Sequence, residues 1–212
     1  MTKSIAKPRR NALVRSQVLD AAVKLFDQLG YFNTSIPDIV AESGVSIGSI
    51  YHHFGDKEGV ARALRDTLLG RVESDLEKIE TRHETTRERC HAVIDLLLRL
   101  TENEPSTMAY MLRARHKEFL SGEAPICSAK PMARMRELIS LGMAGGEVRE
   151  MAPDVAAAMV YGPALRLIQL RLDGLIDTAL TEYLDDIWEM SWNAVALPAS
   201  REQIKVQAVS TA

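Results

Sequence analysis

The sequence of 212 residues is poor in cysteine and has no long apolar segment. Its two cysteines, Cys90 and Cys127, form no C-x-x-C pair, and no histidines stand at metal-ligand spacing. A disulfide framework, a metal site and a bound cofactor are therefore not expected. Charged residues interrupt every apolar run well before the ~20 residues that a membrane span requires. They also break the apolar stretch near the start, unlike a signal peptide, so we expect a cytoplasmic protein without a membrane partner.

The sequence also lacks a sustained alternation of polar and apolar residues, which is the pattern of a half-buried strand. Apolar residues recur instead at helical spacing, and 46% of the chain is hydrophobic, enough for one large core or two modest ones. The sequence therefore predicts an all-α fold. Helices are expected over residues 11–29, 35–43, 46–54, 56–80, 87–102, 105–120, 129–144, 153–173 and 178–196.

Short polar residues mark where several of these helices begin. Ser35 and Asp38 have the [ST]-x-x-[DE] spacing of a capping box, and Ser46 and Asp56 can cap the next two helices. Pro163 predicts a kink or a change of register within its helix, because proline has no amide hydrogen. The apolar residues expected to face inward from the first helix are Val14, Val18, Ala21, Ala22, Leu25 and Leu29.

Acidic residues are absent from residues 1–16, which contain five basic side chains. The first 57 residues hold seven basic against five acidic side chains, although the whole chain has a net charge of -3. This split indicates that the front of the chain meets a polyanion. We expect a basic flexible arm at residues 1–10, in which Lys7, Arg9 and Arg10 contact this polyanion.

Residues 35–54 fit a helix-turn-helix, in which two short helices flank a tight turn that contains glycine. Two longer stretches, VLDAAVKLFDQLGYFNTS and GVSIGSIYHHFGDKEGV, resemble the amino-terminal domain of the TetR family of bacterial regulators. The resemblance implies a DNA-binding domain at residues 11–57 and a helical ligand-binding and dimerisation domain at residues 58–196. Residues 197–212 contain little that could pack and are expected to be a disordered tail.

The resemblance implies a homodimeric transcriptional regulator, a repressor that sits on a palindromic operator until a small-molecule effector releases it. In the recognition helix, Gly48 removes bulk near the duplex, and Ser49 is the first candidate for a base contact. Ile47 offers an apolar contact where many family members carry a charged or polar residue. The further DNA contacts implied are Thr34, Ser35, Ser46, Tyr51, His53 and Lys57. Packing of Tyr51 on the first helix, and a local carbonyl partner for His53, are the alternatives.

The family commonly encloses its ligand in the second domain, so apolar helices with a few polar groups are candidates for the pocket. These candidates are Met108, Tyr110, Met111, Arg113, His116, Phe119, Met159, Tyr161 and Arg166. Arg113 and His116 would orient an acidic or carbonyl-bearing ligand. The alternative is that methionines fill the core and arginines pair at the surface. Cys127 is either a sensor of oxidants or inert.

A stripe at helical spacing near the end of the chain predicts a four-helix dimer interface made by the last two helices of each subunit. Its residues are Leu180, Leu184, Ile187, Trp188 and Ser191. Burial within the same chain would explain the stripe equally well. Two rival functions remain open: a helical enzyme subunit using Arg113, His116 and Glu118 as acid–base groups, and an interaction protein whose helix-turn-helix no longer binds DNA. No nucleophile or phosphate-loop motif supports the enzyme, so no catalytic residue is assigned.

Overall fold

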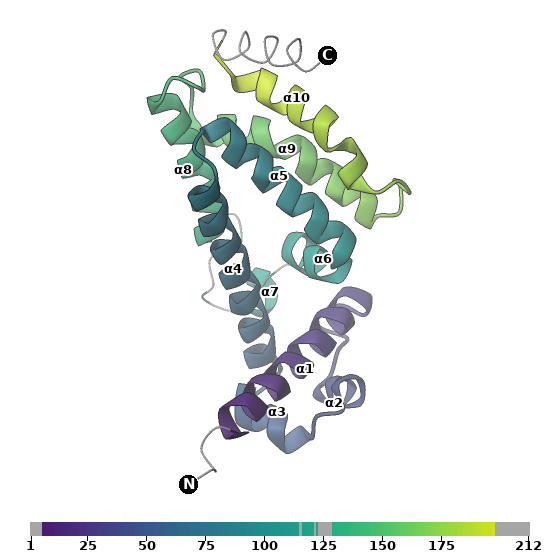
Figure 1. The fold of residues 1–212 in the computed structure, drawn as a ribbon. Helices are drawn as coiled ribbons and strands as arrows, with labels where there is room; N and C mark the ends of the chain where they lie inside the picture. Colours follow the sequence, from purple (N-terminus) through teal and green to yellow (C-terminus); the bar gives the residue numbers. More distant parts are fainter. Residues whose placement is uncertain (1–5, 115, 121, 123–128, 198–212) are drawn as a thin grey trace. The chain divides into compact units, whose positions relative to one another are not determined.

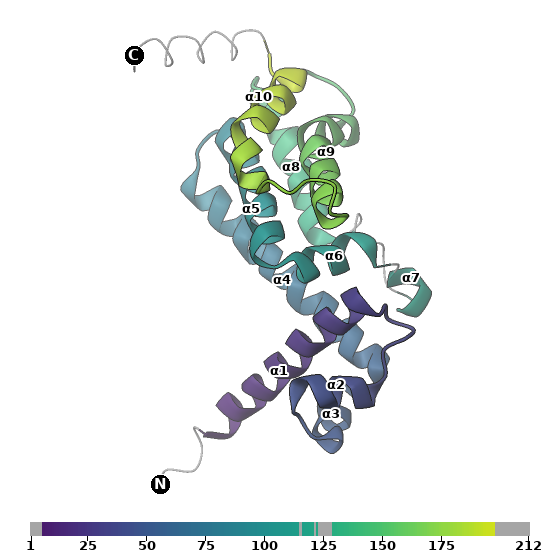
Figure 2. The ribbon, with the colours of Figure 1, turned by 90° about the vertical axis from the view of Figure 1, so that its right-hand side faces the viewer.

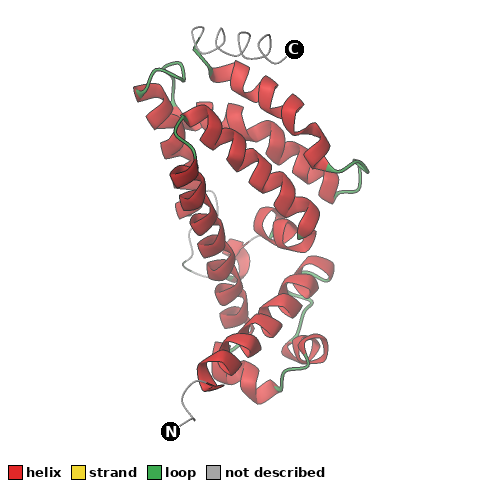
Figure 3. Cartoon of the chain, in the orientation of Figure 1, coloured by secondary structure: helices red, strands yellow, loops and turns green. Residues whose placement is uncertain are grey.

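The computed structural model describes residues 6–114, 116–120, 122 and 129–197. These residues form helices joined by loops, as Figure 3 shows, which confirms the all-α fold. One isolated bridge pairs Val148 with Ala196. No helix within the described ranges is long and apolar enough to cross a membrane. In chain order, the elements are α1 (Ala6–Gln28), α2 (Ile36–Ser43), α3 (Ile47–Phe54), α4 (Lys57–Arg82), α5 (Thr86–Asn103), α6 (Pro105–Arg113), α7 (His116–Phe119), α8 (Lys130–Ala144), α9 (Pro153–Leu172), the 3-10 helix η2 (Leu180–Tyr183) and α10 (Leu184–Val195).

The chain divides into two compact units. Unit 1 comprises residues 1–71 and 106–126, and unit 2 comprises residues 72–105 and 127–212. Helix α4 therefore contributes residues to both units, while α6 and α7 lie almost wholly in unit 1. This division differs from the expected boundary near residue 57, because the segment 106–126 joins the unit that contains the helix-turn-helix.

Unit 1 is built around α1, which packs against α2 and α3 (Figure 1). Val18 and Phe26 of α1 are buried together with Ile39 of α2 and Ile50 of α3. The helical spacing predicted that Leu29 would also face inward, but Leu29 is 47% exposed. The helix ends at Gln28, and the chain then leaves the helical path, so the helical spacing no longer holds.

Side-chain caps set the beginnings of the short helices. The Ser35 hydroxyl accepts a hydrogen bond from the Asp38 amide, and the Asp38 carboxylate accepts one from the Ser35 amide, so the expected capping box is confirmed. Ser46 caps α3 by accepting from the Ser49 amide. Asp56 accepts from the Gly59 amide at 2.7 Å at the start of α4, also as expected. Gly44, with φ of +68°, ends α2 in the left-handed conformation that glycine adopts without strain.

Unit 2 packs α5, α8, α9 and α10 side by side, as the views in Figures 1 and 2 both show. The core residues contributed by these four helices include Ile94, Leu98, Leu138, Ile139, Val160, Ile168, Ile187 and Trp192. Two ion-pair groups join distant segments. Arg134 of α8 binds Glu73 and Glu80 of α4, and Arg171 of α9 binds Glu102 of α5.

Three of the expected helices differ clearly from those in the structure. Helix α1 begins at Ala6, so residues 6–10 of the expected flexible arm are helical. The expected helix at 105–120 is divided around Ala114, because the chain turns there and packs His116 and Phe119 against other rings. The last helix is preceded by η2, whose Leu180 amide donates to Glu102. Pro163 lies inside α9 without dividing it.

Gly59, in the first turn of α4, lies close to the end of α3. A Cβ at this position would overlap the carbonyl oxygen of Phe54, the last residue of α3, whereas a Cβ at Gly70 in α4 would meet nothing within 4 Å. We expect Gly59→Ala to lower the free energy of unfolding by about 3 kcal/mol. The control Gly70→Ala should raise it by about 0.5–1 kcal/mol. Urea unfolding followed by circular dichroism measures both, and equal effects of the two substitutions would contradict this account.

Candidate nucleic-acid interface and aromatic pocket

Helix α3 exposes one face and buries the other. Ile47 and Tyr51 are 48% and 50% exposed, and Gly48 and His52 are exposed beside them, whereas Ile50 is fully buried. Residues at i, i+1, i+4 and i+5 share a helix face, so the four exposed residues form a continuous surface. This α3 face (Ile47, Gly48, Tyr51 and His52) carries no lysine, arginine or carboxylate.

Gly48 has no packing role inside the chain. A Cβ built on it would meet nothing within 4 Å, so alanine would fit without strain. Glycine in a helix costs stability relative to alanine. An exposed helical glycine that nothing in the protein requires is well suited to the close approach of a partner.

The serines at the helix starts are occupied by capping. The Ser35 hydroxyl lies 2.6 Å from the Asp38 carboxylate and donates to it, while Ser46 accepts from the backbone of Ser49. Ser35 and Ser46 nevertheless remain exposed, and Ser49 is half-buried. Their first role is therefore to begin α2 and α3, and any contact with DNA would be made by groups that are already held in place.

Thr34 is not a DNA contact, contrary to the sequence expectation. Its side chain is only 1% exposed. The hydroxyl lies 2.9 Å from the Gly30 carbonyl oxygen and 3.3 Å from that of Leu25, and donates to these oxygens. Thr34 thus closes the turn that follows α1, and a polar residue at this position serves the backbone instead of a phosphate.

Lys57 makes two hydrogen bonds within unit 1, and its expected role as a phosphate contact stays a prediction. Its Nζ donates to the carbonyl oxygens of Tyr31 at 2.9 Å and Thr34 at 2.8 Å. The same Nζ lies 4.3 Å from the centre of the Tyr31 ring. Burial lowers the pKa of Lys57. We call these contacts the Lys57 bridge; they join the first residue of α4 to the turn between α1 and α2.

The positive charge beside α3 comes from α1. Nη1 of Arg15 lies 3.4 Å from the carbonyl oxygen of His53 and donates to it, and the guanidinium lies 4.9 Å from the centre of the Phe54 ring. Arg10 and Arg15 are both exposed, while His53 is half-buried. Sequence reasoning missed Arg15 as a site residue, although it noted the basic run at residues 1–16. The run indicated a polyanion but not that Arg15 would reach the end of the recognition helix.

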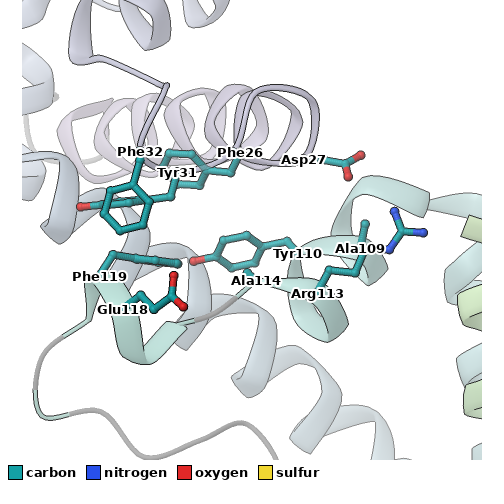
Figure 4. A pocket seen from close by; sticks show the side chains of 11 residues that line it. Phe26, Asp27, Tyr31, Phe32, Ala109, Tyr110, Arg113, Ala114, Glu118 and Phe119 are labelled. Atoms are coloured by element: carbon teal, nitrogen blue, oxygen red, sulfur yellow. The ribbon is translucent and has the colours of Figure 1, made fainter. Parts of the chain in front are cut away.

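Unit 1 also contains a cavity of about 300 Å³ between the end of α1, α6 and α7 (Figure 4). Three of the expected ligand residues, Tyr110, Arg113 and Phe119, line it. Met108, Met111 and His116 are at least 93% buried but do not line it. The complete lining consists of Phe26, Asp27, Gly30, Tyr31, Phe32, Ala109, Tyr110, Arg113, Ala114, Glu118 and Phe119.

The other three expected ligand residues belong to α9 of unit 2. Met159 and Arg166 are exposed, and Tyr161 is buried with its hydroxyl 3.2 Å from the sulfur of Cys90. None of these three residues lines the cavity that contains Tyr110. Burial raises the pKa of Cys90 to about 12, so its thiol is unreactive at neutral pH. Cys127 lies outside the described residues.

The stripe predicted to form the dimer interface belongs instead to the core of unit 2. Leu180, Ile187, Trp188 and Ser191 are between 0% and 7% exposed, and Leu184 is half-buried. The rings of Trp188 and Trp192 stack with centroids 5.2 Å apart. Side chains buried within one chain cannot contact a partner, so the dimer prediction is wrong for the four buried residues. The alternative of burial within the chain is correct for them.

Two of the proposed acid–base residues, Arg113 and Glu118, line the cavity, whereas His116 does not. No group of three or more histidines, cysteines or carboxylates within the described residues could hold a metal ion. His116, one of the proposed acid–base residues, is 5% exposed, and its burial lowers its pKa to about 4. An imidazole that is neutral and shielded from solvent at pH 7 is poorly suited to proton transfer with a bound molecule.

Residues 18–64 match the family described as "Bacterial regulatory proteins, tetR family", and residues 67–197 match "Tetracyclin repressor-like, C-terminal domain". The chain is 38% identical over 80 residues to the HTH-type transcriptional regulator HbdR of Aromatoleum sp., a match that spans 37% of this chain and only 35% of that relative. It is 29% identical over 161 residues to the HTH-type transcriptional regulator BetI of Rhizobium meliloti, spanning 74% of this chain and 77% of that one. A crystal structure of a TetR family regulator from Marinobacter aquaeolei VT8 has the same fold, with a TM-score of 0.77 and 21% identity, covering 89% of this chain and 98% of that one.

The contacts of the Lys57 bridge are expected to stabilise the folded protein. We expect Lys57→Met to lower the free energy of unfolding by about 2 kcal/mol, because two partly buried carbonyl oxygens lose a charged donor. The control is Lys24→Met, which removes an exposed ion pair with Glu42 and should change stability by at most about 0.5 kcal/mol. Thermal unfolding followed by circular dichroism distinguishes them. A Lys57→Met protein as stable as Lys24→Met would show that the bridge contributes little.

Proposed function

The chain belongs to the TetR family of bacterial transcriptional regulators, and we propose that it represses transcription as a cytoplasmic homodimer on a palindromic operator until a small-molecule effector releases it. The protein is a ligand-responsive regulator with an amino-terminal DNA-binding domain. The proposal assigns the contacts with DNA, the partner surface and the direction of the response.

The exposed α3 face carries the proposal. It presents Ile47, Gly48 and Tyr51 on a helix that Ile50 anchors from behind. An α-helix fits the major groove of B-DNA, where an apolar side chain can contact a thymine methyl and a hydroxyl can bind a base edge or phosphate. Ile47 would supply the first contact and Tyr51 the second, with Gly48 allowing the backbone to approach.

Phosphate contacts come from α1 in this proposal. Helix α3 contains neither lysine nor arginine, whereas Arg10 and Arg15 are exposed on α1 and Arg15 reaches the end of α3. Each phosphate neutralised by such a group adds close to one unit to the salt dependence of binding. The two arginines would therefore supply affinity that depends on salt, and α3 would supply the choice of sequence.

The partner surface is proposed on the outer faces of α9 and α10. These helices pack against each other and expose Val155 and Met159 on α9 and Met190 on α10, which is 66% exposed. An isologous contact between two copies would cover these apolar side chains. Binding to successive major grooves requires the two copies of α3 in the dimer to lie about 34 Å apart, or a multiple of it.

The two rival functions make different demands. An enzyme would convert a small molecule into a product. The proposed regulator would only bind its effector, and would bind it more tightly in the DNA-free conformation. An interaction protein without DNA binding would retard no DNA. Specific retardation of DNA flanking the chain's own gene separates the proposal from this second rival.

Gly48→Ala tests the DNA-binding surface. We expect the substitution to leave thermal stability unchanged or raised and to weaken operator binding about tenfold, because the new methyl keeps the helix from the duplex. The control Gly70→Ala, a helical glycine that is equally uncrowded, should leave operator binding unchanged. Fluorescence anisotropy with a selected operator measures the affinity. Unchanged affinity of the Gly48→Ala protein would remove α3 from the interface.

Met159→Asp combined with Met190→Asp tests the partner surface. A carboxylate at each position should break an apolar contact between subunits and yield monomers, while both side chains are exposed enough for the subunit to fold. Leu141→Asp, an equally severe change at an exposed residue of α8, should leave the dimer intact. Sedimentation velocity distinguishes the two species. Dimers from the double variant would move the interface elsewhere.

A further inference from the structure

The cavity in unit 1 is lined mainly by aromatic rings. Phe26 comes from α1, Tyr31 and Phe32 come from the turn that follows it, and Tyr110 and Phe119 come from α6 and α7. Figure 4 shows the rings of Tyr31, Phe32 and Phe119 at one end of the cavity and the charged groups of Asp27 and Arg113 at the other. Most small-molecule sites have this composition, with apolar walls and a few polar groups that fix orientation.

The rings already adopt the geometry in which aromatic groups attract one another. Tyr31 and Phe119 stack with centroids 4.0 Å apart and planes inclined by 14°. The Phe32 ring is nearly perpendicular to both, with its centroid 5.4 Å from that of Tyr31 and 6.3 Å from that of Phe119. Phe32 itself remains 65% exposed, so it leaves an apolar surface uncovered. A planar ring entering the cavity would cover that surface and extend the same arrangement of edges and faces.

The cavity is tied directly to the helix-turn-helix through Tyr31. Phe119 stacks on one face of its ring, and a ring at 4.0 Å leaves no room for an ammonium group on the same face. Nζ of Lys57, 4.3 Å from the ring centre, therefore lies on the opposite face. Any shift of the Tyr31 ring moves a contact of Lys57, which also holds the Thr34 carbonyl next to the capping box of α2.

We propose that this cavity is an effector site that binds a compact molecule carrying a planar aromatic ring, and that its occupation changes operator affinity through Tyr31 and the Lys57 bridge. The volume of about 300 Å³ suits a single ring with one short substituent. The regulatory half of the inference rests on the proposed function, whereas the binding half does not. The site lies within the unit that contains α3, so the signal needs no rearrangement of unit 2.

The test uses the full chain and three probes that share a benzene ring and differ in charge: benzyl alcohol, benzoate and benzylamine. We expect at least one to bind with millimolar affinity or better by titration calorimetry, and the order of the three reveals the charge that the cavity favours. Phe32→Ala removes an exposed ring of the site, and Ala114→Leu fills part of the cavity. Both substitutions should lower the affinity for the probe about tenfold.

Leu13→Ala provides the matched control, because Leu13 is 60% exposed on α1 and does not line the cavity. Its affinity for the probe should equal that of the unaltered chain. Binding of none of the three probes, or binding that Phe32→Ala and Ala114→Leu leave unchanged, would overturn the assignment of the site.

Operator affinity measured with and without the bound probe tests the regulatory half. We expect a change of about fivefold or more. An operator affinity that a saturating probe leaves unaltered would overturn the regulatory role while the proposed DNA binding stands. If the probe-free chain retards no DNA, the proposed function fails, and calorimetry still decides whether the cavity binds aromatic rings.

Discussion

One ammonium group ties together the part of the chain that meets DNA. Nζ of Lys57 donates to the carbonyl oxygens of Tyr31 and Thr34, so the first residue of α4 is fastened to the turn between α1 and α2. Helix α3 ends at Phe54, three residues earlier, and is thereby held between a fixed turn and a fixed helix start. Buried carbonyl oxygens require donors, and a charged donor forms the stronger hydrogen bond. The angle at which α3 presents its exposed face therefore depends on a contact that α3 itself does not make.

In the proposed complex with DNA, this arrangement would divide recognition between two helices. Helix α3 is positioned by contacts at both of its ends. It can therefore present an uncharged surface, because it needs no lysine or arginine of its own to bind phosphates. The α3 face accordingly contains Ile47, Gly48 and Tyr51, while exposed arginines stand on α1. Attraction to phosphates acts at any DNA sequence and weakens with salt, whereas contacts with base edges depend on sequence. Separating the two on different helices lets the sequence preference change by substitution on α3 without altering the general attraction to DNA.

The features predictable from the sequence are the local ones. Ser35, Asp38, Ser46 and Asp56 cap helices through neighbours three residues away, so their spacing alone defines the interaction. The carbonyl contacts of Thr34 and Lys57 could not be predicted, because a hydroxyl or an ammonium that binds a backbone carbonyl is the same residue type as one that binds a phosphate. The stripe from Leu180 to Ser191 correctly indicated burial, but helical spacing does not say whether the covering surface belongs to the same chain. The aromatic cavity was only partly foreseen, since Phe26 and Tyr31 meet Tyr110 and Phe119 across about eighty residues of sequence.

Energetics place a condition on any effector that acts through this cavity. Shifting a two-state equilibrium from 1:99 to 99:1 requires about 5.5 kcal/mol of preference for one state. A small aromatic molecule with micromolar affinity releases about 8 kcal/mol in total. The molecule must therefore bind the operator-bound conformation much more weakly than the DNA-free conformation. A slight narrowing of the cavity in the operator-bound conformation would not produce so large a difference in affinity. The stack of Phe119 on Tyr31 meets this condition if it closes the cavity when DNA is bound, because the ligand and Phe119 then compete for the face of Tyr31 opposite Lys57. Ligand binding and the stack of Phe119 on Tyr31 would thus be alternatives decided at one aromatic ring.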